Sequence, residues 1–178
     1  MKKNNSSVSV KSKLWFYVLL LWDYQRGRQY PKLLINAPDY FKEKVNMCIY
    51  SQQLRECYIF SKCEDDLIRQ IVSKMEELTF FPGNYITYEG DMDETMYFIY
   101  RGKVEMYREE ELSATFIDVL QEGQAFGLSQ GLFRSMPQEY TYCAKTYVVI
   151  LSLRRSTWEY LLEYFPASKK SIFEWFEV

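Results

Sequence analysis

The 178-residue sequence contains no histidine, and this absence removes much of the chemistry that a protein of this size can perform. Histidine is the commonest general base in enzymes and the commonest protein ligand of transition metals. Without it neither a Ser-His nor a Cys-His nucleophile pair can form, and histidine-based metal sites are excluded. The sequence therefore argues against an enzyme and predicts no metal site.

Cysteines are few, and their spacing does not indicate a metal site. None of the four belongs to a CxxC pair, and the intervals between them are irregular. We expect free and mostly buried thiols in a reducing compartment. The four are Cys48, Cys57, Cys63 and Cys143.

Long hydrophobic runs are also missing. The apolar run at residues 14–22 is nine residues long, whereas a helix that crosses a bilayer needs roughly 20. Two lysines precede the run, as in a signal peptide, but no small-residue cleavage site follows it. A helix that begins near Ser12, after a loose polar tail at residues 1–12, is the preferred interpretation, and a signal peptide is the alternative.

Basic charge is not concentrated anywhere in the chain. The 22 Lys and Arg residues are interspersed among 24 Asp and Glu residues, for a net charge of −2. A nucleic-acid-binding protein would show a basic stripe, so we expect no nucleic-acid partner. Apolar residues make up 48% and aromatic residues 18% of the chain, which is sufficient to fill a hydrophobic core.

The pattern of the first part of the chain is helical up to about Ile71. Apolar residues three and four positions apart predict helices over residues 14–27, 38–57 and 63–78. Gly27 is placed to end the first helix, and three acidic residues occupy the first turn of the third. These acids are Glu64, Asp65 and Asp66.

From Phe80 onward the pattern changes to short β-rich runs separated by glycine turns. A final helical region follows, in which Ser156 is a candidate cap and Pro166 a break. Short strands at this spacing predict a small antiparallel barrel or jelly roll, so the fold class is α+β with an N-terminal helical linker and C-terminal helices. The predicted strands lie at 84–90, 96–102, 103–109, 115–123 and 141–153.

One stretch carries a family resemblance. The segment "FPGNYITYEGDMDETMYFIYRGKVEMY", residues 81–107, closely resembles the opening half of a cyclic-nucleotide-binding domain. Residues 37–78 are similar to the helical C-linker and first domain helix of cyclic-nucleotide-gated and hyperpolarisation-activated channels. The resemblance covers residues 14–176 and implies a tail at 1–12, a linker-like segment at 13–57 and the domain at 58–178. Matching positions are Phe81, Pro82, Gly83, Ile86, Glu89, Gly90, Met96, Tyr97, Phe98, Ile99, Gly102 and Val104.

The resemblance also implies a place for the ligand. In the family, the cyclic phosphate lies at the N-terminus of a short helix after F-G-E, where backbone N–H groups favour an anion. The Glu accepts from the ribose hydroxyl, and an Arg in a later R-[ST]-A pairs with the phosphate. Here Leu128 replaces the Glu, and Tyr140 stands at the position matched to the Arg, which predicts a degenerate cassette. Its residues are Phe126, Gly127, Leu128, Ser129, Gln130, Arg134, Tyr140, Thr141 and Tyr142.

Three features of this cassette have two interpretations each. Arg134 either substitutes for the missing anchor or is a solvated loop arginine. Tyr140 and Tyr142 share one strand face, and they either fill the emptied pocket or pack on neighbouring strands. The last aromatic residues either cover the pocket mouth or close the core against the barrel. These aromatic residues are Phe173, Trp175 and Phe176.

The functional expectation follows from this resemblance. It implies a regulatory module of a voltage- or cyclic-nucleotide-gated cation channel, similar to the potassium channels of the ether-a-go-go branch, with weak or no binding of cAMP or cGMP. The module would act in gating or assembly at the cytoplasmic face of the membrane, which it would contact only through the channel. Residues 14–55 would contact the pore and the other subunits of a tetramer. The alternative is a stand-alone regulatory protein that senses cAMP or cGMP.

Overall fold

The computed structural model describes Trp15, residues 38–110 and residues 113–176. The chain divides into two compact units, Met1–Lys42 and Glu43–Val178. The expected tail, the expected helix at 14–27 and much of the expected subunit contact at 14–55 lie outside the described residues. No described helix has the length and apolar character needed to span a membrane.

The described residues form helices at both ends of the chain and strands between them. The helices are α3 (Asp39–Glu56), α4 (Asp65–Val72), α5 (Leu128–Leu132), α6 (Arg155–Trp158) and α7 (Pro166–Phe173), with 3-10 helices η1 (Glu159–Glu163) and η2 (Glu174–Phe176). The strands are β1 (Glu76–Phe80), β2 (Tyr85–Thr87), β3 (Thr95–Arg101), β4 (Val104–Glu109), β5 (Ala114–Leu120), β6 (Ala125–Phe126), β7 (Thr141–Ala144) and β8 (Val148–Arg154).

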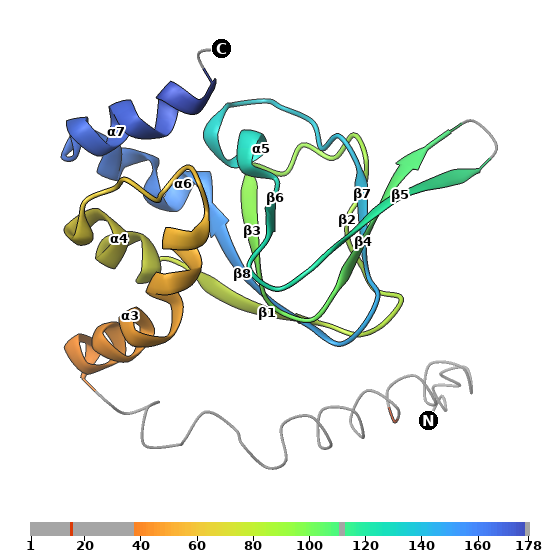
Figure 1. Ribbon diagram of the computed structural model, residues 1–178, viewed down its shortest axis with the longest axis horizontal. Helices are drawn as coiled ribbons and strands as arrows, with labels where there is room; N and C mark the ends of the chain where they lie inside the picture. The colour runs from red at the N-terminus through yellow and green to blue at the C-terminus, as the bar shows by residue number, and fades with distance from the viewer. Residues whose placement is uncertain (1–14, 16–37, 111–112, 177–178) are drawn as a thin grey trace, which may run out of the picture. The chain divides into compact units, whose positions relative to one another are not determined.

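The strands form two four-stranded sheets with antiparallel pairing. The strand order is β1-β8-β3-β6 in the first sheet and β2-β7-β4-β5 in the second. Figure 1 shows the sheets curling around a common interior, with α4, α6 and α7 gathered on one side of the roll. This is the predicted α+β jelly roll with terminal helices.

The first sheet is buried on both faces, and this explains the continuous apolar runs of β3 and β8. On β3, Met96 and Phe98 pack with the helices, whereas Tyr97 and Ile99 point into the roll. The same alternation on β8 divides its apolar side chains between two hydrophobic clusters. One cluster joins the sheet to the helices, and the other fills the interior of the roll.

The third predicted helix, at residues 63–78, is too long. Helix α4 ends at Val72, and β1 begins at Glu76. Glu76 and Leu78 pair with Ser152 and Ile150 of β8. The backbone hydrogen bonds gained at this sheet edge outweigh the helix preference of Glu and Leu, because local propensity is the weaker influence.

The single strand predicted at residues 141–153 is two strands. A turn separates β7 from β8, and it packs on the β3–β4 turn, where Lys145 N–H donates to Lys103 O at 2.9 Å. Gly102 allows this contact, since its φ is +97° and a Cβ there would lie 2.3 Å from Tyr147 O. The chain thereby changes sheets between β7 and β8.

The C-terminal helices differ in one detail from the prediction. Ser156 is the second residue of α6 and not its cap, while Pro166 begins α7, where proline is well tolerated. The cysteines are free, and three of the four are buried, as predicted. Burial raises the pKa of Cys57 to about 11, so this thiol stays protonated at neutral pH.

Candidate functional site

The candidate site is built on the turn between β6 and α5. Gly127 has φ +68°, and a Cβ there would lie 2.6 Å from Thr95 O, so only glycine fits without strain. The N–H of Gly131 donates to Gly127 O at 2.9 Å and closes the first turn of α5. A Cβ on Gly131 would lie 2.2 Å from the Met96 side chain, so α5 approaches β3 closely.

A cavity of about 220 Å³ opens beside this turn, and we call it the cassette cavity. Its lining holds a single ionisable acid, Glu139, and no lysine or arginine. An anion in this cavity would therefore have an acidic residue nearby and no cationic side chain in the lining. The lining residues are Met106, Leu120, Ala125, Phe126, Gly127, Leu128, Ser129, Gln130, Gln138, Glu139 and Tyr142.

Aromatic rings fill the interior next to the cassette cavity. Tyr142 stacks on Phe126 with centroids 4.1 Å apart, and Phe126 stacks on Tyr97 at 5.0 Å. Burial, with smaller contributions from Glu139 and Tyr140, raises the pKa of Tyr142 to about 12. Tyr142 is thus a neutral core residue that also forms one wall of the cavity.

Six of the nine predicted cassette residues line the cavity. They are Phe126, Gly127, Leu128, Ser129, Gln130 and Tyr142. Tyr140 does not line it: its ring packs edge-on against Tyr142, and its hydroxyl accepts from Arg108 Nη2 at 3.1 Å. Both tyrosines therefore pack on their neighbours, which agrees with the strand-packing interpretation.

Thr141 points to the opposite face of β7, as alternation along a strand requires. Its hydroxyl donates to Glu109 Oε1 at 2.8 Å and accepts from the N–H of Glu89 at 2.9 Å. Thr141 therefore does not line the cassette cavity.

Arg134 lies outside the cassette cavity. Its guanidinium forms an ion pair with Glu159 at 3.3 Å, and its side chain is 74% exposed. The structure agrees with a solvated loop arginine and does not place a substitute anchor at α5.

Gln138 and Glu139 are the cavity residues that the sequence motif did not predict. Gln138 is 2% exposed, and its Nε2 lies 3.4 Å from the position of a Cβ on Gly127. Gln138 therefore lies against the start of α5, whereas Tyr140, the residue matched to the family Arg, does not line the cavity. Both residues precede β7, which begins at Thr141.

The C-terminal aromatic residues do not line the cassette cavity, and two of them, Phe173 and Phe176, pack against the cluster that joins the sheet to the helices. Phe173 and Phe176 pack edge-on against Phe133, with centroids 5.9 and 5.4 Å apart. Trp175 packs against Tyr58 at 5.3 Å. In the described part of the chain, three or more metal-binding side chains are nowhere grouped closely enough to hold an ion.

Comparison with known proteins decides the family. The model of the cyclic nucleotide-binding domain matches residues 77–165, which include both sheets and the cassette turn. The chain belongs to the cyclic nucleotide-binding domain family. The matched residues include the cassette turn and two of the residues that line the cavity beside it, Leu128 and Gln138.

Curated relatives of this cyclic nucleotide-binding domain are channels. A cyclic nucleotide-gated channel of Caenorhabditis elegans is 28% identical over 127 residues, 71% of this chain and 17% of the relative. The cone photoreceptor subunit alpha of Gallus gallus is 31% identical over 113 residues, 64% of this chain and 15% of the relative. The chain therefore spans less than a fifth of the length of these relatives.

A solved structure shares the fold. The N-terminal domain of a transcriptional regulator from Streptomyces coelicolor A3(2) superposes with a TM-score of 0.61 at 24% identity. The superposition covers 68% of this chain and 86% of that chain. At this identity the likeness concerns the fold alone.

Proposed function

We propose that this cyclic nucleotide-binding domain is a non-enzymatic regulatory module of a cation channel whose pocket no longer binds cAMP or cGMP with useful affinity. The observation that supports the proposal is the charge of the cassette cavity. Its lining includes the acidic residue Glu139 and no lysine or arginine, while the family ligand carries a phosphate anion. Backbone N–H groups at the start of α5 remain, but a single helix turn gives an anion only modest stabilisation.

The lost side-chain contacts account for a large reduction in affinity. A charge-assisted hydrogen bond to the phosphate contributes roughly 1.5–3 kcal/mol, and the neutral bond to the ribose about 1 kcal/mol. Losing both weakens binding on the order of 10²-fold, before repulsion from Glu139 is counted. The volume of about 220 Å³ is also small, since pockets for small molecules occupy roughly 300–1,000 Å³.

The channel context rests on the curated relatives, which are cyclic nucleotide-gated channels. We propose that the domain works at the cytoplasmic face of a potassium-type channel, in gating or assembly through protein contacts. Residues 14–55 would supply the contact with other subunits of a tetramer. A stand-alone sensor of cAMP or cGMP is the alternative, and it requires the nucleotide affinity that the cassette cavity argues against.

A gain of binding tests the proposal. The variant L128E/Q138R/E139T restores an acid after Phe-Gly and an Arg-Thr pair opposite α5. Calorimetry should show that this triple variant binds cAMP or cGMP with an affinity at least about 10²-fold higher than that of the parent chain. The matched variant L128E/Y140R places the arginine at the position that does not line the cavity, and it should gain only the roughly fivefold that the ribose acceptor supplies.

Two results would count against the proposal. A folded triple variant that binds no better than the parent chain would mean that the missing anchors are not what limits binding. A gain in L128E/Y140R equal to that in the triple variant would mean that the arginine position is wrongly assigned.

A further inference from the structure

A second cavity, of about 450 Å³, lies on the other side of the second sheet, and we call it the tyrosine cavity. Tyr107 and Thr141 line it, whereas their strand neighbours Met106 and Tyr142 line the cassette cavity. Because successive side chains on a strand point to opposite faces, the two cavities are separated by the sheet. The lining consists of Tyr85, Tyr88, Tyr107, Glu109, Glu110, Ser113, Ala114 and Thr141.

Three tyrosine rings contribute to the wall of this cavity. Tyr85 and Tyr88 stack on each other with centroids 4.9 Å apart, yet they remain 53% and 48% exposed. Tyr107 packs edge-on against Phe116 at 5.9 Å. An exposed group of aromatic rings at a concave surface is characteristic of a binding site, because it leaves apolar area in contact with water.

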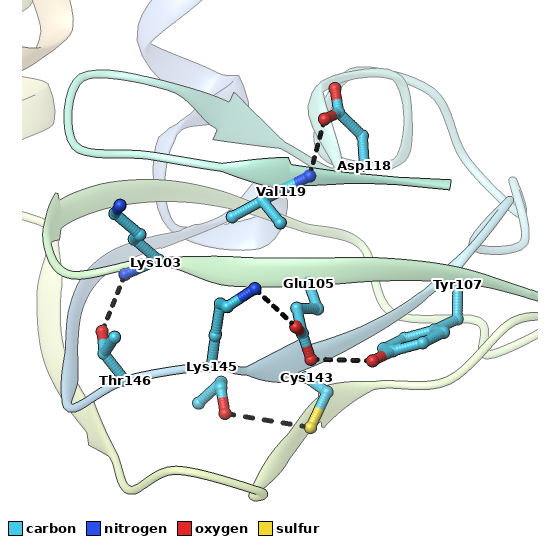
Figure 2. Close-up of polar contacts among 9 residues, drawn as sticks. Lys103, Glu105, Tyr107, Asp118, Val119, Cys143, Lys145 and Thr146 are labelled. Carbon is cyan, nitrogen blue, oxygen red and sulfur yellow. Dashed lines mark hydrogen bonds and ion pairs between the residues drawn. The ribbon is translucent and has the colours of Figure 1, made fainter. Parts of the chain in front are cut away.

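Figure 2 shows how the sheet holds Tyr107 in place. The Tyr107 hydroxyl donates to Glu105 Oε2 at 2.7 Å, and Lys145 Nζ lies 3.0 Å from Glu105 Oε1. The charge of Lys145 is thereby balanced by Glu105. The hydrogen bond to the Glu105 carboxylate raises the pKa of Tyr107 to about 12, so the phenol stays neutral at physiological pH.

The charge that remains at the tyrosine cavity is negative. Glu109 and Glu110 line it, and its lining includes no lysine or arginine. Thr141 donates to Glu109 Oε1 at 2.8 Å and so orients this carboxylate. The faces of aromatic rings also carry negative potential, so the rings and the carboxylates favour the same kind of ligand.

We propose that the tyrosine cavity binds a small organic cation with an alkylated ammonium group. Alkylated ammonium ions suit such a site because their methyl groups contact ring faces while their charge is attracted by the rings and the carboxylates. The volume of about 450 Å³ lies within the range of small-molecule pockets, unlike that of the cassette cavity. The family nucleotides are anions, so this site is chemically distinct from the cassette.

A pair of isosteric probes tests the proposal. Choline carries a trimethylammonium group, and 3,3-dimethylbutan-1-ol has the same shape without the charge. We expect choline to shift the ring NMR signals of Tyr85, Tyr88 and Tyr107 with saturation, and the neutral alcohol to bind at least about fivefold more weakly. Equal binding of the two probes, or no saturable shift with choline, would overturn the proposal.

Matched variants separate the contribution of the Tyr85 ring to choline binding from that of its hydroxyl. A further variant separates the charge of Glu109 from its shape. Y85L removes an exposed ring and should weaken choline binding at least about threefold, whereas Y85F keeps the ring and should preserve it. E109Q keeps the oxygen that accepts from Thr141 but removes the charge, and it should also weaken binding. Unchanged choline affinity in both Y85L and E109Q would refute the assignment.

Discussion

Single side chains decide what the cavity beside α5 can hold. Leu128 offers no acceptor, Gln138 offers an amide where a cation is needed, and Glu139 adds negative charge. Tyr142 occupies the adjacent interior by stacking on Phe126. In the function proposed above, the backbone frame of an anion site is kept while its charge complementarity is removed.

Tyr142 should make the folded state sensitive to alkaline pH. Burial raises its pKa from the ordinary value of 10.0 to about 12, so the folded state favours the neutral phenol. The resulting stability is fully present below pH 10 and is lost as the pH rises from 10 to 12. The loss should reach roughly 2 kcal/mol.

Urea denaturation between pH 8 and pH 12 measures this effect in the parent chain and in Y142F. The variant should show a smaller decrease in the free energy of unfolding between pH 10 and pH 12. An equally steep decrease in Y142F would contradict the assignment to this hydroxyl. Cys57 and other buried groups contribute to both profiles and leave the difference unaffected.

Gly127 should be intolerant of substitution. In G127A the new methyl group would meet Thr95 O at 2.6 Å in a backbone conformation with φ +68°, so we expect a loss of roughly 2–3 kcal/mol. Gly83 is the matched control, because it has φ +81° but a Cβ at this position would meet nothing within 4 Å. G83A should lose only about 1 kcal/mol in urea denaturation, and equal losses would contradict the steric argument.

At the level of secondary-structure elements, the first sheet is the centre of the fold. Strand β3 contributes alternate side chains to the helix-facing cluster and to the interior of the roll. Phe98 is 1% exposed and packs against Phe60 at 6.2 Å. Elements far apart in the sequence therefore depend on this one strand.

F98A should cost about 3–5 kcal/mol of folding free energy, because it leaves a cavity between sheet and helices. F116A is the control on the second sheet, since Phe116 is 52% exposed, and it should cost less than about 1 kcal/mol. Urea denaturation of the two variants measures both losses of folding free energy. Similar losses in the two variants would contradict the central position of the first sheet.

Much of the fold was predictable from the sequence, because strand alternation and glycine turns are local signals. The break after Ala144 and strand β1 were missed, since both depend on pairing with distant strands. For the same reason the sequence located the cassette turn but did not single out Gln138, which lies against it. The position of Gln138 is fixed by backbone bonds to Asp91 and Gly90, more than forty residues earlier.

At the scale of the whole molecule, the domain presents two cavities on opposite faces of one sheet. The cassette cavity keeps the family turn but is small and carries an acid, while the larger tyrosine cavity is aromatic and acidic. Neither lining includes a lysine or arginine that could attract a nucleotide. The charge of these two cavities is consistent with the proposed regulation by protein contacts.

Calorimetric titration of the parent chain with cAMP and with cGMP tests the central claim most directly. We predict no saturable heat up to millimolar concentrations of either nucleotide, because the cassette cavity has no cationic anchor and includes Glu139. Saturable binding in the micromolar range would contradict the account and would favour a nucleotide sensor.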